Sequence, residues 1–217
     1  MSFEQTFLFV IEMIGTVAAA ISGIRMAAAR EFDWFGAYSV GLVTAIGGGT
    51  LRDLLLGIPV FWMQSIWYLA VTLLSLAVVI VFKKVLVHTR ILFIFDTIGL
   101  ALFVVIGIQK SLAADYYMWV AIIMGVITGA CGGVFRDVLL NQEPLLFKKD
   151  LYATACLVGG IIYWGMIQLG FSVPSQGLAC AATVIMMRIL AVRYGWSLPV
   201  MRSTDDNFNE TRDYDNK

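Results

Sequence analysis

The strongest constraint in this sequence is that one unit occurs twice, 84 residues apart. Residues 47–53, Gly-Gly-Gly-Thr-Leu-Arg-Asp, recur at 131–137 as Cys-Gly-Gly-Val-Phe-Arg-Asp. Alignment of residues 8–58 with residues 92–142 needs no gap and yields 16 identities in 51 pairs. Self-similarity at a fixed period indicates two copies of one structural unit, so the fold must be explained as a duplication.

The composition places these units in a lipid bilayer. Hydrophobic residues make up 60% of the 217 residues and charged residues only 14%, whereas soluble domains carry about 25% charged residues. Apolar runs of roughly 20 residues, the length that crosses the hydrocarbon core, recur along the chain. We therefore predict an all-α membrane protein with seven transmembrane helices, at about 6–29, 35–56, 65–82, 91–109, 117–140, 152–170 and 175–193.

The helix count predicts how the two units are arranged. Three spans per unit make the second unit enter the membrane from the opposite side, so a pseudo-two-fold axis in the membrane plane relates the units. We expect a first three-helix repeat at 1–90, a second, inverted repeat at 91–172 and a seventh helix at 173–201. The polar tail at 202–217 is expected to be disordered and cytoplasmic.

The distribution of Lys and Arg predicts the orientation. Loops on one side of the membrane collect Arg25, Arg30, Lys83, Lys84, Arg90, Lys148, Lys149, Arg193 and Arg202, and the other side has little beyond Lys110. Because cytoplasmic loops are rich in these residues, we expect the N-terminus outside and the C-terminus in the cytoplasm. The natural interpretation is a multi-pass protein of a bacterial inner membrane, whose basic clusters can also attract anionic lipid headgroups.

The glycine runs can be interpreted in two ways. Discontinuous helices at corresponding positions of two inverted halves mark a permeation or substrate site, but small residues also let helices pack closely. The glycines occur in both copies, and an Arg-Asp pair follows each of them. We therefore favour functional breaks, at Gly47, Gly48 and Gly49 in one repeat and at Gly132 and Gly133 in the other.

Each of these helices also carries a polar stripe, because positions i, i+3, i+7 and i+11 share one helical face. The stripes are Gly41, Thr44, Gly48 and Arg52 in the first repeat, and Gly125, Thr128, Gly132 and Arg136 in the second. Bare backbone, a hydroxyl group and a guanidinium suit the wall of a narrow polar pathway. Hydroxyl and carbonyl oxygens near Thr44 and Thr128 are suitable ligands for a weakly held cation, with no tightly bound metal.

Acidic residues inside the predicted spans are expected to be paired, because a charge at that depth is costly. Inversion puts Glu12 on the side of Arg52, and Asp96 on the side of Arg136. We expect Glu12–Arg52 and Asp96–Arg136 ion pairs, with the neighbouring Asp53 and Asp137 as competing partners. The alternative is that these acids only assist helix packing.

Other functional classes find little support in the sequence. The three cysteines, Cys131, Cys156 and Cys180, are scattered within apolar runs, which argues against a disulfide framework or a metal site. His88 stands in a basic loop and is best interpreted as a solvated side chain. No nucleophile–base arrangement or phosphate-binding loop is present. We therefore expect no enzyme activity, no cofactor and no nucleic-acid partner.

With both motifs in view, the chain resembles the prokaryotic members of the TRIC family, the trimeric intracellular cation channels. The resemblance covers roughly residues 5–195 and is most specific at residues 47–53 and 132–137. It implies a homotrimer in which each protomer has its own pore for K⁺ and other monovalent cations. It also implies that the first, second, fourth and fifth helices line that pore, and that the second and fifth bend at their glycines. Cys131 departs from the pattern, so the two bends are expected to be unequal.

Three functions remain open at this point. A cation channel, conducting K⁺ and Na⁺ and gated at the glycine breaks, is our main prediction. Bacterial proteins with this repeated domain are also grouped as glycine transporters, so a carrier for a small amino acid is the alternative. Arginine at each mouth would repel cations unless neutralised, which would be the task of Glu12, Asp53, Asp96 and Asp137. A purely structural scaffold would leave these intramembrane charges without a purpose.

Overall fold

The computed structural model describes residues 3–82, 89–147 and 151–199, and over these ranges the chain is largely helical. The expectations for His88, for Lys83, Lys84, Lys148 and Lys149, and for the tail at 202–217 concern residues outside these ranges. The α-helices within them are α1 (Phe3–Ala28), α2 (Trp34–Leu56), α3 (Trp67–Val81), α5 (Thr89–Ala113), α6 (Met118–Leu139), α7 (Ala153–Gln168) and α8 (Val173–Tyr194). Short 3-10 helices follow α2 and α6, as η1 (Phe61–Gln64) and η2 (Leu145–Phe147). The predicted set of seven helices is confirmed.

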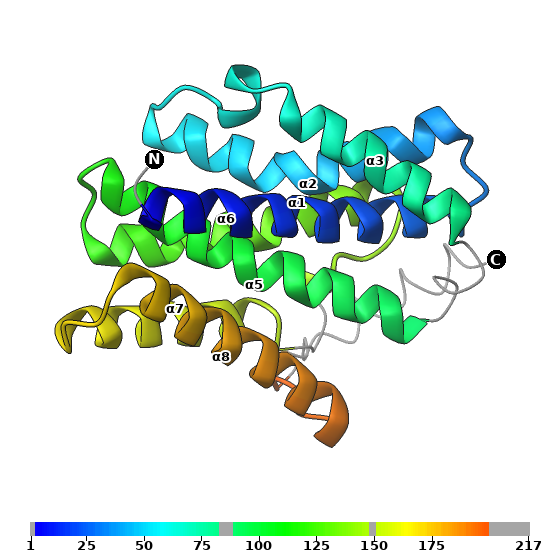
Figure 1. The fold of residues 1–217 in the computed structure, drawn as a ribbon. Helices are drawn as coiled ribbons and strands as arrows, with labels where there is room; N and C mark the ends of the chain where they lie inside the picture. The colour runs from blue at the N-terminus through cyan, green and yellow to red at the C-terminus, as the bar shows by residue number, and fades with distance from the viewer. Residues whose placement is uncertain (1–2, 83–88, 148–150, 200–217) are drawn as a thin grey trace, which may run out of the picture.

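The helices lie side by side, with α1, α2, α5 and α6 packed on one another as a central group (Figure 1). The third helix of the first repeat, α3, packs on α1 and α2. Its counterpart in the second repeat, α7, packs on α6 and α5 at the opposite side of the bundle. Helix α8, which belongs to neither repeat, packs on α7 and α5. The fold is therefore two inverted three-helix repeats plus a seventh helix.

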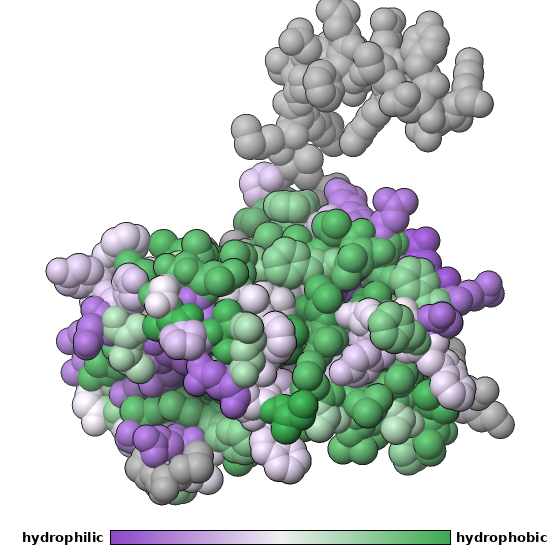
Figure 2. Space-filling model, turned by 90° about the horizontal axis from the view of Figure 1, so that it is seen from above, coloured by the Kyte–Doolittle hydropathy of each residue, from purple (hydrophilic) through white to green (hydrophobic). Residues whose placement is uncertain are grey.

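The surface fits a lipid environment. Five helices, α1, α2, α5, α6 and α8, are long and apolar enough to cross a membrane, and α3 and α7 are shorter apolar helices of 15 and 16 residues. Figure 2 shows hydrophobic residues over most of one face, with hydrophilic residues gathered mainly toward its two ends. Exposed side chains such as Leu73, Leu74 and Ile161 would be unfavourable in water but are solvated well by acyl chains.

The turns between helices repeat with the same 84-residue offset as the sequence. After α1, Glu31 takes a left-handed conformation with φ of 59°, and after α5 Asp115 does so with φ of 60°. Gly57 ends α2 with φ of 66°, and Asn141 ends the equivalent helix with φ of 50°. Gly and Asn are the residues that best tolerate this helix-terminating conformation. The duplication therefore extends to the backbone conformation of the turns.

Inside each repeat the first two helices pack through small residues. A side chain at Gly23 would collide with Thr44 and with the Gly41 backbone. In the second repeat, a side chain at Gly107 would meet Thr128 and the backbone of Gly125 in the same way. Close approach of two helices requires residues without bulky side chains at the crossing.

The glycine runs form the crossing between the repeats. A Cβ atom at Gly48 would overlap the carbonyl oxygen of Thr128, and one at Gly132 would overlap that of Thr44. Helices α2 and α6 both continue through their glycines without interruption. The predicted breaks at Gly47–Gly49 and at Gly132–Gly133 are therefore wrong for this conformation. Close packing through small residues, the alternative interpretation, is what the structure shows.

Replacing Gly48 by Ala should destabilise the protein by roughly 1–3 kcal/mol, because the added methyl group overlaps backbone that cannot move aside. The matched control is Gly165→Ala in α7, where an added Cβ atom meets nothing within 4 Å. This control should leave stability unchanged or raise it slightly, because alanine favours helix. Thermal unfolding in detergent checks both variants. Equal melting temperatures for the two would contradict the close crossing.

Candidate functional site

Arg52, near the C-terminal end of α2, is the centre of the first charged cluster. Its side chain is only 1% exposed, and its Nε donates a hydrogen bond to Asp53 Oδ1 at 2.7 Å. The other carboxylate oxygen of Asp53 accepts the backbone N–H of Phe61 at 2.9 Å, and the Arg52 guanidinium lies over the Phe61 ring. A buried guanidinium of this kind is tolerable only because its charge is paired at close range.

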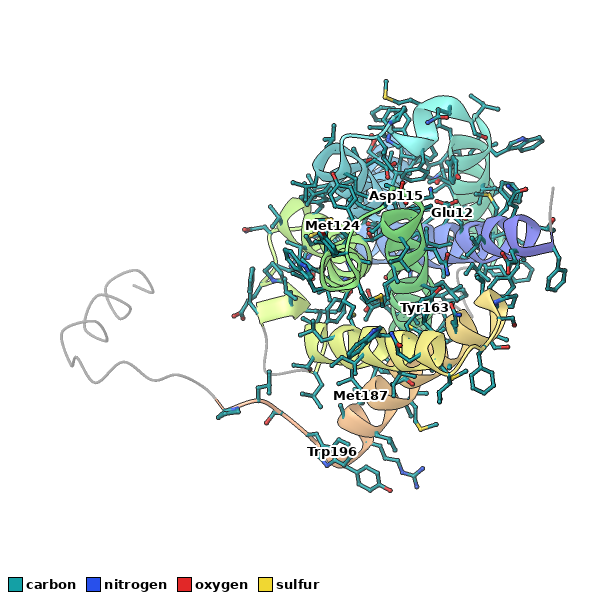
Figure 3. All side chains as sticks on the ribbon, turned by 90° about the vertical axis from the view of Figure 1, so that its left-hand side faces the viewer. Glu12, Asp115, Met124, Tyr163, Met187 and Trp196 are labelled. Carbon is teal, nitrogen blue, oxygen red and sulfur yellow. The ribbon has the colours of Figure 1, made fainter. Side chains whose placement is uncertain are left out.

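Glu12 belongs to the same cluster but does not pair with Arg52. Its Oε1 lies 2.7 Å from Lys110 Nζ, and its Oε2 accepts a hydrogen bond from the Tyr68 hydroxyl at 3.1 Å. The carboxylate lies inside the helix bundle (Figure 3) and is 9% exposed. The expected Glu12–Arg52 pair is therefore wrong. Both carboxylate oxygens of Glu12 bind Lys110 and Tyr68, and Arg52 pairs with Asp53 instead. We call Glu12, Arg52, Asp53, Phe61, Tyr68 and Lys110 the Arg52 cluster.

The second cluster is built around Arg136 of α6. Its Nε donates to Asp137 Oδ1 at 2.8 Å, and its Nη1 donates to Asp96 Oδ1 at 2.6 Å and to Ser22 Oγ at 2.8 Å. The backbone N–H of Leu145 donates to Asp137 Oδ2 at 3.0 Å. The predicted Asp96–Arg136 pair is confirmed, and Asp137, the competing partner, binds the same guanidinium.

Arg188 of α8 completes this second cluster, although the sequence analysis did not single it out. Its Nη1 lies 3.3 Å from Asp96 Oδ2, and its guanidinium stacks over the rings of Tyr152 and Phe93. Burial raises the pKa of Tyr152, so this phenol stays neutral beside the charges. An arginine in the middle of an apolar span is the signal that could have identified Arg188. We call Ser22, Asp96, Arg136, Asp137, Tyr152 and Arg188 the Arg136 cluster.

The two clusters are built on one plan. Equivalent hydrogen bonds join residues 84 positions apart, in the sets Arg52, Asp53 and Phe61 and Arg136, Asp137 and Leu145. Glu12 and Asp96, and likewise Tyr68 and Tyr152, stand at equivalent positions of the two clusters but have different partners. The tyrosines were missed because the repeat was aligned only up to residue 58. Extension of the same offset to residue 68 would have found them.

Three of the cavities that the described residues form lie beside the charged clusters. The Lys110 pocket, of 380 Å³, adjoins the Arg52 cluster and is lined by Asp53, Ile58, Pro59, Phe61, Gln64, Ser65, Tyr68 and Lys110. The Arg136 pocket, of 190 Å³, is lined by Met26, Leu92, Phe93, Asp96, Arg136, Asp137, Gln142, Glu143, Leu145, Leu151, Arg188, Ala191 and Val192.

The third cavity is small and central, at 10 Å³, and its lining includes Thr44, Asp96, Phe103 and Gly133. This volume is about that of one water molecule, so it is too small for a hydrated ion. Asp96 borders both this cavity and the Arg136 pocket. The Arg136 cluster therefore lies between an open pocket and a small cavity next to Thr44.

The predicted stripe residues are buried, and Thr44 lines the small central cavity. Thr44 Oγ1 donates to Val40 O, and Thr128 Oγ1 donates to Met124 O, each at 2.6 Å. The hydroxyl protons are therefore used within the helices, and the oxygen lone pairs stay free to accept. Gly47 and Gly49 face the rings of Phe135 and Phe61, and Gly133 faces the Tyr152 hydroxyl. Gly49 and Gly133 therefore make room for cluster residues, and none of the three glycines breaks its helix.

The cysteines have no part in either cluster. Cys156 and Cys180 are buried and Cys131 is half-buried, and all three are free thiols. Their prediction as small apolar side chains is consistent with this burial. Within the described residues, no group of three or more His, Cys, Asp or Glu side chains could hold a metal ion.

Fold and site together define a helical membrane protein of inverted repeats with buried charged clusters in the two halves, an arrangement common among membrane transport proteins. The family described as "Glycine transporter" matches the chain twice, at residues 9–84 and 93–168, again 84 residues apart. These two matches cover most of the sequence. The chain belongs to this family.

Relatives and solved structures agree with this assignment. A "UPF0126 membrane protein" of Vibrio cholerae is 39% identical over 93% of this chain and 85% of its own length. The "UPF0126 inner membrane protein YadS" of Escherichia coli is 37% identical over 91% of this chain and 97% of its own length. The TRIC trimeric intracellular cation channel orthologue from Rhodobacter sphaeroides superposes with a TM-score of 0.82 at 30% identity, covering 88% of this chain and 99% of that structure. The resemblance to prokaryotic TRIC proteins is confirmed, and the chain is a membrane protein.

Replacing Asp137 by Asn should cost about 3–5 kcal/mol of stability, because it leaves the Arg136 guanidinium buried with one partner fewer. The matched control is Asp33→Asn at the exposed N-cap of α2, where Asp33 accepts the Gly36 N–H. Asparagine caps helices as well as aspartate does, so the control should stay close to the unchanged protein. Chemical unfolding in detergent measures both. A similar small loss at Asp33 and Asp137 would contradict a structural role for the buried pair.

Proposed function

We propose that this protein is a channel for monovalent cations, K⁺ among them, in the bacterial inner membrane. It works as a homotrimer with one pore per protomer, between α1, α2, α5 and α6. The observation that carries the proposal is the pair of buried charged clusters at the two ends of the central group, each beside a pocket, with Asp96 also bordering the small cavity at Thr44. The fold shared with the Rhodobacter sphaeroides cation channel orthologue supports it.

The carboxylates explain how cations could pass two arginines. Arg52 and Arg136 each bind an adjacent aspartate, so neither presents an unpaired positive charge to the path. Glu12 and Asp96 add a second negative charge at each end. Between them, the oxygen lone pairs of Thr44 and Thr128 can replace part of the hydration shell of a weakly held K⁺.

Gating is proposed at the α2–α6 crossing. The backbones touch there, Gly48 on Thr128 and Gly132 on Thr44, and the cavity beside Thr44 and Phe103 measures only about 10 Å³. Backbones that touch without side chains between them can slide or separate with few rotamer changes. A small shift at this crossing would widen the path for an ion.

The membrane orientation follows from the basic loops. With the N-terminus outside and the C-terminus in the cytoplasm, the Arg52 cluster faces outward and the Arg136 cluster faces the cytoplasm. Lys and Arg on the cytoplasmic side would also contact anionic lipid headgroups. The chain would then present its two mouths to different compartments.

A secondary carrier for a small amino acid such as glycine is the second candidate. The description of the matching family favours it, and inverted repeats suit alternating access as well as conduction. A carrier would use the Arg136 pocket as a binding site that closes toward either side. The two candidates differ in turnover, because only a channel passes enough ions to give unitary currents.

Recording from the purified protein in a planar bilayer under a KCl gradient tests the channel. We expect unitary current steps that reverse near the K⁺ equilibrium potential. A quiet bilayer together with saturable accumulation of labelled glycine in proteoliposomes would establish the carrier instead. Empty liposomes treated with the same detergent are the control.

Replacing Lys110 by Met should raise the unitary K⁺ conductance about two- to fivefold, because it removes a positive charge from the mouth next to Glu12. Methionine is the residue that the first repeat has at the equivalent position, Met26. Size-exclusion chromatography checks that the variant keeps the assembly of the unchanged protein. An unaltered unitary current would show that Lys110 lies outside the ion path.

A further inference from the structure

The pseudo-symmetry of the two clusters singles out one residue that has no counterpart. Each cluster holds an arginine, an adjacent aspartate, a second carboxylate and a tyrosine, at positions 84 residues apart. The two clusters differ in the additional cation that lies beside the second carboxylate. At Glu12 it is Lys110 of α5, and at Asp96 it is Arg188 of α8, a helix outside the repeats.

The equivalent of Lys110 in the first repeat is Met26, which lines the Arg136 pocket without a charge. The Arg136 pocket therefore has no cation at the position equivalent to Lys110. It receives one from α8 instead. Arg188 is 5% exposed and borders the pocket, as do Ala191 and Val192 one turn further along the same helix.

Arg188 contacts Asp96 as an ion pair without a hydrogen bond. Asp96 Oδ1 is held by Arg136 at 2.6 Å, whereas Asp96 Oδ2 faces Arg188 at 3.3 Å and makes no hydrogen bond. Arg188 Nη1 likewise lacks a hydrogen bond. The guanidinium is held mainly by stacking over the rings of Tyr152 and Phe93, at 4.5 and 5.0 Å. Arg188 can therefore leave Asp96 without breaking a hydrogen bond, while Arg136 cannot.

The position of Asp96 makes this contact relevant to conduction, since this carboxylate borders both the Arg136 pocket and the central cavity. While Arg188 faces its free oxygen, the charged residues lining the pocket are three acids and two arginines. Without Arg188, the three acids would face a single arginine, and Asp96 Oδ2 would be available to a cation entering the narrow region.

We propose that Arg188 is the latch of the Arg136 mouth: it masks Asp96 and sets how readily cations enter from that side. Because Arg188 is carried by α8, a shift of this helix would open the mouth without any change in the repeats. The latch acts on one mouth only. This inference rests on the proposed channel function.

The test is the K⁺ current of Arg188→Met in inside-out patches from giant spheroplasts, where the orientation of the membrane is defined. We expect the current that enters through the Arg136 mouth to rise about threefold or more, and the opposite current to rise less. The current–voltage relation should therefore rectify in the sense opposite to that of Lys110→Met. Arg188→Lys keeps the positive charge and should show the current–voltage relation of the unchanged protein.

The matched control is Arg193→Gln, which removes an exposed arginine of the same helix that lies over Tyr194. It should leave the current unchanged. If Arg188→Met proves unable to fold, Phe93→Leu tests the same latch, because it removes one supporting ring and keeps every charge. It should shift the rectification in the same direction by a smaller factor.

The outcomes separate this inference from the proposed function. Cation currents of the unchanged protein together with identical currents in Arg188→Met or Phe93→Leu would overturn the latch and leave the channel standing. An equal rise in both current directions would also overturn it, because a latch acts at one mouth. Absence of current from the unchanged protein, with glycine uptake in its place, would overturn the channel itself.

Discussion

The structure depends on the backbone contact between α2 and α6. Gly48 lies against the Thr128 carbonyl, and Gly132 lies against the Thr44 carbonyl, so each repeat supplies the glycine for the other's threonine. This reciprocity brings the two halves together at equivalent points. It also sets the threonine hydroxyls and the narrowest cavity at one level. A side chain at either glycine would separate the halves and displace everything that the crossing aligns.

The charged clusters extend that arrangement toward both ends of the bundle. Arg52 and Arg136 stand one helical turn beyond the crossing glycines, and each binds the aspartate that follows it. Those aspartates in turn accept the backbone N–H of Phe61 and Leu145, at the starts of the two short 3-10 helices. A buried Arg-Asp pair is therefore also the anchor of the loop that follows α2 or α6. Asp53 and Asp137 therefore anchor these loops and also line the pockets at the two ends of the bundle.

Much of this plan could be predicted from sequence, because duplication is visible as an offset and membrane spans as apolar runs. The helices, the inversion and the Asp96–Arg136 pair follow from those two patterns. The Glu12–Arg52 pair failed for a definite reason: symmetry predicts which residues are equivalent, but not which equivalent sites have diverged. Ser22 Oγ accepts a hydrogen bond from Arg136, whereas its counterpart Ile106 has no polar atom to offer Arg52. The uninterrupted helices were missed because a glycine run has the same appearance whether it breaks a helix or lets two helices touch.

The places where the repeats differ are therefore the most informative about function. An exact duplication would give the bundle two identical ends. The membrane, however, separates two compartments that differ from each other. This chain keeps the carboxylates, arginines and tyrosines common to both ends and varies the cation beside them. At one end Lys110, whose side chain is 29% exposed, reaches Glu12 from within a repeat, and at the other Arg188, only 6% exposed, reaches Asp96 from α8. The partly exposed ammonium of Lys110 contacts the solution on its side of the membrane. The buried guanidinium of Arg188, stacked on two rings, moves with α8. Helix α8 therefore makes the two ends of the pseudo-symmetric bundle different from each other. The duplication alone could not provide this difference.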